Sequence, residues 1–351
     1  MGKRVIIGMS GGVDSSVCAY LLKKAGYDVV GVTMHTWQDG DVSSPMILPP
    51  MVEDAKNVAK RLSIPHYVVD FRKQFKDKVV DYFIGEYLKG KTPNPCNMCN
   101  PKIKWEALLD DALDIHADYV ATGHYSKIKQ LDNGRFAITN SVTSTKDQTY
   151  ALYSLRQEQL KRTLMPIGEY TKDEIRSIAN EIGLDVANKP DSQDICFIPD
   201  GDYAAFIKRF CKEKITLGNF VNTDGQIIGK HKGIINYTIG QRKGLGLAMG
   251  HPVFVTGIDA ENNQVVVGEN EDLFVTKVYA NNINFMGIES FNNEELIGKI
   301  RYSHKGTPCT VSMIDEDTLE CKFTSPVRAA TPGQALVLYK DDYVAAGGTI
   351  C

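Results

Sequence analysis

The feature that most constrains this fold is an apolar run followed at once by a short loop of serine and glycine. The run Val5-Ile6-Ile7-Gly8-Met9 predicts a buried first strand of a parallel sheet, and residues 16–24 have the pattern of a helix. Between them lies the loop Ser10-Gly11-Gly12-Val13-Asp14-Ser15. Such a loop presents backbone N–H groups at a helix N-terminus, where the helix dipole favours an anion, and its glycines let the backbone approach a phosphate closely. The sequence therefore predicts a phosphate-binding site at this junction.

The loop does not end in Gly-Lys-Ser/Thr, so it is not the lysine-containing P-loop. It resembles the PP-loop of the ATP-pyrophosphatase superfamily, whose members cleave ATP to AMP and pyrophosphate in order to adenylate a substrate. An ordinary strand–helix turn is the competing interpretation, because Ser, Gly and Asp all favour turns. The complete six-residue run at the first strand–helix junction favours the nucleotide site.

Length and composition bound the class of protein. The chain has 351 residues, enough for two or three domains, and its 43% of hydrophobic residues is ordinary for a soluble globular protein. No apolar run approaches membrane-spanning length, and the predicted first strand begins too early to leave room for a signal peptide. Eight scattered cysteines fit a reducing compartment. We therefore expect a cytoplasmic protein with no membrane partner.

The first part of the chain alternates predicted strands and helices. The strands are residues 29–34, 66–70 and 119–122, and the helices are residues 52–62, 79–88 and 104–115. This alternation implies an α/β fold with a doubly wound, Rossmann-like parallel sheet, whose ligands lie beyond the C-terminal ends of the strands. Ser10, Met34, Gly123 and His124 all fall at such ends. Asn133-Gly134 then predicts a β-hairpin, and Thr171 with Glu174 predicts a capped helix over residues 171–181.

After about residue 200 the pattern changes to short β-like runs. One helix is predicted at residues 203–210. The β-like runs are residues 226–229, 253–258, 264–267, 274–280, 298–302, 309–314, 318–323 and 335–339. Their spacing predicts one or two small all-β units, at least one of them a barrel.

Three cysteines stand in settings that favour chemistry. Cys96-Asn97-Met98-Cys99 lies in a segment bounded by prolines, which we expect to be a loop over residues 91–101. A Cys-x-x-Cys pair can chelate a metal, form a redox disulfide or carry a reactive thiolate, and the charges of Lys102 and Lys104 would favour the thiolate. Cys196 follows a second polar segment. In the alternative interpretation, Cys96 and Cys99 are an incidental pair, and Cys196 is a small buried apolar residue. The other cysteines are expected to be structural or incidental: Cys18, Cys211, Cys309, Cys321 and Cys351.

Ordered blocks along essentially the whole chain give it a close resemblance to the tRNA-specific 2-thiouridylases, which thiolate C2 of the wobble uridine. The blocks are Gly8 to Ser15, Gly31-Val32-Thr33-Met34, Thr92-Pro93-Asn94-Pro95, Cys99-Asn100, Ala121-Thr122-Gly123-His124-Tyr125, Lys146-Asp147-Gln148, Asp191-Ser192-Gln193, Cys196-Phe197-Ile198, the run from Tyr237 to Gly246, and Thr331-Pro332-Gly333-Gln334. The resemblance agrees with a PP-loop nucleotide-binding catalytic domain at residues 1–199, a small central tRNA-binding domain at 200–268 and a C-terminal β-barrel domain at 269–351.

The resemblance also implies roles for individual residues. It implies that Cys196 carries the persulfide sulfur and that Cys99 is its catalytic partner. The residues implied to bind ATP are Gly8, Met9, Ser10, Gly11, Gly12, Val13, Asp14, Ser15, Met34 and Gly123. Those implied to face the tRNA and its target base are Asn94, Pro95, Cys96, His124, Lys146, Asp147, Gln148, Arg301, Tyr302 and Gln334.

The chemistry of these residues is coherent with such a reaction. Adenylation by ATP turns the O2 of uridine into a good leaving group, and Mg²⁺ would neutralise the pyrophosphate, with Asp14 contributing to its placement. A persulfide on Cys196 then supplies sulfur to C2, and attack by Cys99 would leave a Cys99–Cys196 disulfide. The target base must leave its stack to react.

One position departs from the family pattern, because many members carry Asp where this chain has Cys96. Cys96, Cys99 and Cys196 could then hold a 4Fe–4S cluster with one open iron that binds hydrosulfide. The cluster and the persulfide would compete for the same residues. In the alternative interpretation, Cys96 is only a small residue lining the base pocket.

The partners expected are tRNA and a sulfur donor, either a relay protein or a cysteine desulfurase, with the chain itself a monomer. Net charge is −3, so tRNA contact would depend on a local basic patch. The basic residues of the central region are Lys208, Arg209, Lys212, Lys214, Lys230, Lys232, Arg242 and Lys243. Two other function classes remain: another PP-loop adenylating enzyme, such as a tRNA 2-thiocytidine enzyme or an amidotransferase-type synthetase, and a non-catalytic tRNA-binding protein.

Overall fold

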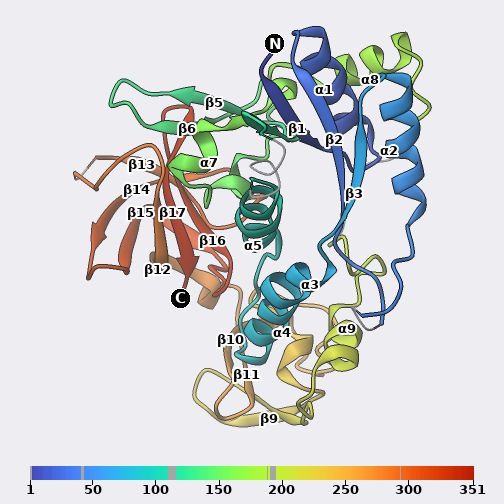
Figure 1. The fold of residues 1–351 in the computed structure, drawn as a ribbon. Helices are drawn as coiled ribbons and strands as arrows, with labels where there is room; N and C mark the ends of the chain where they lie inside the picture. Colours follow the sequence, from blue (N-terminus) through green and yellow to red (C-terminus); the bar gives the residue numbers. More distant parts are fainter. Residues whose placement is uncertain (1, 41–42, 110–115, 188, 190–194, 293) are drawn as a thin grey trace.

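The computed structural model describes residues 2–351 apart from 41–42, 110–115, 188, 190–194 and 293. Its first sheet is wholly parallel, with the order β3-β2-β1-β4-β7. The strands are β1 Arg4–Gly8, β2 Asp28–His35, β3 His66–Asp70, β4 Tyr119–Ala121 and β7 Thr163–Leu164. Val5 and Ile7 point to one face, where they share a core with α1 (Val13–Lys24), α2 (Pro50–Arg61) and α8 (Lys172–Glu181). Ile6 points to the other face and packs with Leu108, so helical segments cover both faces and the predicted doubly wound sheet is confirmed (Figure 1).

Helix α1 begins three residues earlier than the sequence pattern indicates. Gly12 is its N-cap, so Val13, Asp14 and Ser15 form its first turn. The last part of the phosphate loop is therefore helical, and its N–H groups point out of the helix N-terminus.

The helical stretch before the Cys-x-x-Cys pair is also longer than predicted. It runs without a break through α3 (Arg72–Phe75), the π-helical η1 (Lys76–Val80) and α4 (Asp81–Leu88). The Cys-x-x-Cys pair itself is not in a loop: α5 (Cys96–Cys99) continues into the π-helical η2 (Asn100–Ala107). The loop prediction was wrong because prolines at a helix start remove N–H groups that have no intrahelical partner there. The end of the predicted helix over residues 104–115, and the block Asp191-Ser192-Gln193, lie outside the described residues.

The predicted hairpin and the capped helix are both present. β5 (Lys127–Gln130) pairs with β6 (Phe136–Thr139), and α8 has the expected capping box at Thr171 and Glu174. The hairpin joins the C-terminal sheet through Thr139 and Tyr343 rather than the parallel sheet. The shorter helices of this region are η3 (Thr149–Leu152), α7 (Gln157–Lys161) and η4 (Pro166–Glu169).

The middle of the chain forms α9 (Tyr203–Phe210), as predicted, and a four-stranded sheet of order β10-β11-β8-β9. Its elements are β8 Gly218–Val221, β9 Ile227–His231, η5 Ile234–Asn236, β10 Phe254–Asp259 and β11 Gln264–Gly268. Its core is shared with the earlier helices, because Phe220 and Val255 belong to the same buried cluster as Phe75 and Phe83. The central sheet therefore packs directly beneath α3 and α4 (Figure 1).

The last part of the chain is a closed barrel. Six antiparallel strands run in the order β12-β15-β14-β13-β16-β17, and β12 pairs with β17 to close the ring. The strands are β12 Phe274–Phe285, β13 Leu296–Lys299, β14 Thr307–Met313, β15 Leu319–Arg328, β16 Ala335–Lys340 and β17 Tyr343–Ile350, preceded by η6 Glu271–Leu273. The barrel prediction is thus confirmed. None of the helices in the described part of the chain is both long and apolar enough to cross a membrane.

Candidate functional site

The phosphate loop is an open helix N-terminus held in shape by its own serines. Gly12 caps α1 without a side-chain hydrogen bond, and Ser15 Oγ accepts from Ser10 N–H at 3.2 Å. Gly11 has a φ of +73°, and a Cβ there would lie 2.3 Å from the carbonyl oxygen of Met51. A glycine is therefore required at this position, and the backbone N–H groups stay available to an anion.

Residues predicted to bind ATP from three strands meet at this loop. A Cβ on Gly123 would lie 2.7 Å from Ser15 N, so the end of β4 touches the first turn of α1. A Cβ on Gly8 would lie 3.6 Å from Met34 Cε, which places β2 beside β1 at the same edge. The structure therefore brings Gly8, Met34 and Gly123 together at the C-terminal edge of the sheet.

Asp14 is bonded to two residues from distant parts of the chain. Its carboxylate accepts from Lys172 Nζ at 2.8 and 2.9 Å and from the Tyr125 hydroxyl at 2.7 Å. Lys172 is the first residue of α8 and its side chain is 13% exposed. The sequence reasoning missed Lys172. Its only signal was its place directly after the capping Thr171, at a helix start that packs against α1.

His124 follows Gly123 and lies buried between the nucleotide loop and the cysteines. Its Nδ1 lies 2.8 Å from Thr122 Oγ1, and its Nε2 lies 3.4 Å from Lys104 Nζ. Because an ammonium only donates, Nε2 is the acceptor and Nδ1–H donates to Thr122. Burial, and then the charge of Lys104, lower the pKa of His124 well below its usual value. The imidazole is therefore neutral.

The three cysteines and Lys104 are electrostatic neighbours. Burial raises the pKa of the Cys99 thiol to about 12, Lys104 opposes this rise, and the thiols of Cys196 and Cys96 add to it. Desolvation and then Cys96 raise the pKa of Cys196, while Lys104 lowers it. Cys96 and Cys196 are exposed, Cys99 is half-buried, and all three are free thiols. Lys104 is thus the cation that stabilises thiolates here.

Lys102 does not share this role. Its Nζ lies 2.9 Å from Glu106 Oε2, on another side of the helix. The sequence placed both lysines near the thiols, and helical periodicity separates them.

The described residues do not form a metal centre. Nowhere in the described part of the chain do three or more His, Cys, Asp or Glu side chains lie as ligands of one ion. Cys96, Cys99 and Cys196 are therefore close enough to influence one another but are not arranged as a cluster ligand set. The chemistry of their donors would suit iron, but their arrangement in this structure does not fit the cluster.

Several residues predicted to face tRNA make hydrogen bonds that hold loops in place. Asn94 Oδ1 accepts from Cys96 N–H at 3.0 Å at the start of α5. Gln148 Oε1 accepts from Tyr125 N–H at 2.8 Å, which fixes the chain just after His124. Asp147 Oδ1 accepts from Thr149 N–H at 3.1 Å. Pro95 is buried and Lys146 is half-buried.

The barrel contributes the remaining predicted residues through two of its loops. Tyr302 donates its hydroxyl hydrogen to the carbonyl of Asp147 at 2.9 Å, and Arg301 donates to the carbonyl of Arg328. Gln334 Nε2 donates to the carbonyl of Thr92 at 2.6 Å. The two barrel loops thus contact the segments that carry Asp147 and Thr92.

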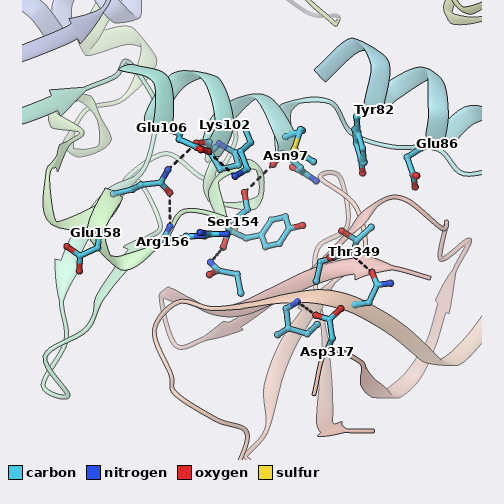
Figure 2. Close-up of a pocket in the computed structure, with 18 of the residues that line it drawn as sticks. Tyr82, Glu86, Asn97, Lys102, Glu106, Ser154, Arg156, Glu158, Asp317 and Thr349 are labelled. Atoms are coloured by element: carbon cyan, nitrogen blue, oxygen red, sulfur yellow. Dashed lines mark hydrogen bonds and ion pairs between the residues drawn. The ribbon is translucent and has the colours of Figure 1, made fainter. Parts of the chain in front are cut away.

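A cavity lies on the other face of the Cys-x-x-Cys helix. Its volume is about 870 Å³, and it separates α4, α5 and η2 from the barrel strands β12 and β17 (Figure 2). Asn97, Lys102, Glu106 and Arg156 line it, and Asp317 lies across from the helix on the barrel. Its described lining includes no residue of the phosphate loop and none of the three cysteines. The cavity is therefore distinct from the nucleotide and sulfur sites.

A parallel sheet with a glycine–serine loop at its first helix, followed by a central sheet and a closed barrel, defines a nucleotide-binding protein of the HUP class with two β domains. Three family matches cover the chain in the same order: "tRNA methyl transferase HUP domain" at residues 3–200, "tRNA methyl transferase PRC-barrel domain" at 204–269 and "Aminomethyltransferase beta-barrel domain" at 275–350.

Full-length relatives name the family more closely. The chain is 56% identical to the tRNA-specific 2-thiouridylase MnmA of Lachnoclostridium phytofermentans, covering 99% of both chains. It is 54% identical to that of Clostridioides difficile, covering 100% of this chain and 98% of the relative. The chain belongs to the tRNA-specific 2-thiouridylase family.

Proposed function

We propose that the protein uses ATP to replace the O2 of the wobble uridine in tRNA by sulfur, with Cys196 and Cys99 as its catalytic thiols. The observation that carries this proposal is the adjacency of Gly123 and His124. Gly123 touches the phosphate loop, and His124 contacts Lys104, which neighbours the thiols. Two consecutive residues therefore connect the nucleotide site to the surroundings of the thiols. The names of the full-length relatives support the same reaction.

The nucleotide half of the reaction follows from the open helix N-terminus. Its N–H groups and the glycines would hold the phosphates of ATP, and Mg²⁺ would neutralise the departing pyrophosphate. Lys172 and Tyr125 hold the Asp14 carboxylate in place beside the loop. The uridine O2 attacks the α-phosphorus, pyrophosphate leaves, and the base is primed with AMP as a leaving group.

The sulfur half needs a persulfide on Cys196. Its terminal sulfur attacks C2 of the adenylated uridine, and AMP departs. The Cys99 thiolate then attacks Sγ of Cys196, so that the new S–S bond joins the two cysteines and the 2-thiouridine sulfur leaves. A dithiol reductant must restore both thiols before the next cycle. Lys104 supports the thiolates at both steps by its charge.

The sequence-level cluster hypothesis stays as the competing route. It requires Cys96, Cys99 and Cys196 to hold a 4Fe–4S cluster, and we derive no step through it because the described thiols are not arranged as ligands. The proposal further includes a monomer acting in the cytoplasm and a donor protein that charges Cys196. The divisions at residues 1–199, 200–268 and 269–351 remain our predicted domain limits.

The experiment is a paired assay on the full chain with unmodified tRNA. Pyrophosphate release reports adenylation, and mass spectrometry of the digested tRNA reports 2-thiouridine. We expect both to depend on tRNA and ATP, and Cys196→Ser to keep the first while losing the second. Thiolation at the normal rate by Cys196→Ser would overturn the proposal, and so would an absence of tRNA-dependent pyrophosphate release.

A further inference from the structure

A second cavity opens directly onto Cys196. Its volume is about 340 Å³, and it lies between the segment after β2 and the helix α9. Among its lining residues are Cys196, Trp37, Phe197, Phe206, Ala205 and Arg209. Cys196 is exposed, so its thiol can be reached from this cavity.

The cavity has an aromatic wall and a charged rim. The ring of Trp37 lies 5.6 Å from that of Phe206 and 5.9 Å from that of Phe197. Arg209 lies 4.6 Å from the ring of Phe210 and forms a 3.0 Å ion pair with Asp39, so its guanidinium is held beside the opening. Packed rings and a stacked arginine make this a preformed surface rather than a gap between loops.

The cavity is separate from the nucleotide side of the site. Its described lining contains no residue of the phosphate loop and none of Cys96, Cys99, Lys104 or His124. The charges that act on the Cys196 thiol nevertheless include Cys96 and Lys104. Cys196 therefore lies between this cavity and the side of the site that carries Cys96 and Lys104. A uridine that is adenylated must lie beside the phosphates of ATP, so the cavity is not where the base reacts.

We propose that this cavity receives the persulfide-bearing loop of a separate donor protein, which charges Cys196 from the side that the ATP loop does not line. The inference rests on the proposed function and adds the place where sulfur arrives. Exposed Lys208, Arg209 and Lys212 lie on or just after the helix that forms one wall. We therefore expect the donor surface that faces α9 to be acidic, because opposite charges steer association.

The transfer balances without any further oxidant. The Cys196 thiolate attacks the outer sulfur of the donor persulfide, the donor's S–S bond breaks, and the donor cysteine leaves as a thiolate. A new S–S bond then holds the sulfur on Cys196 as a persulfide. This step uses neither ATP nor tRNA, so it can be measured alone.

The test fills the cavity from an exposed position. Ala205→Trp adds a bulky ring to an exposed, cavity-lining site on α9, and Glu213→Trp adds the same ring at an exposed position outside it. The probe is a cysteine desulfurase carrying a ³⁵S persulfide, and the readout is label on Cys196 in the full chain. Small-molecule alkylation of Cys196 and tRNA-dependent pyrophosphate release are measured in parallel.

We expect Ala205→Trp to slow labelling at least tenfold while alkylation and pyrophosphate release stay within twofold of the unsubstituted protein, as all three do for Glu213→Trp. Equal labelling of the two variants would overturn the proposal that the donor reaches Cys196 through this cavity. A loss of tRNA-dependent pyrophosphate release in Ala205→Trp, with labelling intact, would assign the cavity to RNA instead. If the unsubstituted protein is labelled yet never thiolates tRNA, the proposed function fails, while the proposal that the donor uses this cavity is still supported.

Discussion

Lys172 Nζ lies 2.8 Å from Asp14 Oδ1, so the first residue of α8 is bonded to the first turn of α1 beside the phosphate loop. The lysine is largely buried, and the same carboxylate also accepts from Tyr125. An ion pair so enclosed holds the carboxylate in one position, which an exposed pair does not do. The nucleotide site therefore depends on a residue far from the loop in sequence.

Replacing Lys172 by Met should slow adenylation. Loss of the ammonium removes the charge that pairs with the Asp14 carboxylate beside the phosphates and leaves one fewer bond to position it, and we expect tRNA-dependent pyrophosphate release to fall roughly 10–100-fold. Lys161→Met is the matched control, because Lys161 pairs with Glu158 on the surface at 3.2 Å. It should change the rate by less than twofold. Equal rates for the two variants would show that the Lys172–Asp14 pair does not position the loop.

A second prediction concerns the contact between β4 and α1. Gly123→Ala places a Cβ 2.7 Å from Ser15 N, so the strand end and the loop must separate. We expect a loss of roughly 1–3 kcal/mol of stability and weaker ATP binding. Thermal unfolding with and without ATP measures both.

The control for this change lies in a helix of the same domain. A Cβ on Gly85 in α4 would meet nothing within 4 Å, so Gly85→Ala should stabilise the helix by up to about 1 kcal/mol. ATP should raise the melting temperature of this variant as it does that of the unsubstituted protein. A Gly123→Ala protein with unchanged ATP binding would contradict the close contact.

The elements that the sequence predicted well are those whose pattern is local. Residues 66–70 and 203–210 match β3 and α9 to the residue, because an apolar run or an amphipathic period decides each one. β17 was missed because its Gly347 and Gly348 weaken the strand signal. A Cβ on Gly347 would lie 2.5 Å from Tyr153 Cδ2 and 3.0 Å from the carbonyl oxygen of Leu336, so the close approach of a distant ring, which no local pattern records, favours glycine there.

The candidate site shows the same limit. The phosphate loop and the grouping of Cys96, Cys99 and Cys196 could be predicted, the first from local chemistry and the others from a family resemblance. The separate environments of Lys102 and Lys104 could not be predicted. The prolines near them suggested a loop, whereas they stand at the start of a helix that turns the two lysines to different sides. Lys172 could not be found either, since its partner Asp14 lies 158 residues away in the sequence.

Lys104 should set the pH dependence of the sulfur chemistry. Its charge lowers the pKa of both Cys99 and Cys196, against the burial that raises each. Removing the charge in Lys104→Met raises both pKa values further, so the thiolate fraction at a fixed pH falls. We expect the alkylation profile to move upward by roughly one pH unit, which is about a tenfold loss of rate at pH 8.

The matched control for Lys104 is its near neighbour. Lys102→Met removes an equal charge that is engaged by Glu106, and the pH profile should stay in place. Peptide mass spectrometry after timed alkylation reads each cysteine separately. Equal shifts in the two variants would mean that general charge, not the position of Lys104, governs the thiols.

The last prediction separates the two sulfur routes through Cys96. If sulfur travels as a persulfide, Cys96→Ser should thiolate tRNA within about fivefold of the unsubstituted protein, because an exposed thiol outside the Cys99–Cys196 exchange is replaced by a hydroxyl of similar size. Cys99→Ser should stop turnover, since it removes the thiol that attacks Cys196. Cys351→Ser, at the exposed C-terminal residue, is the control and should be fully active.

The metal content of the same proteins tests the cluster route directly. Each protein is purified without oxygen and assayed for iron, sulfide and visible absorbance, and we expect colourless, iron-free enzyme. Iron bound to the unsubstituted protein, lost together with activity in both Cys96→Ser and Cys99→Ser, would instead establish the cluster, because three thiolates would then be needed to hold it.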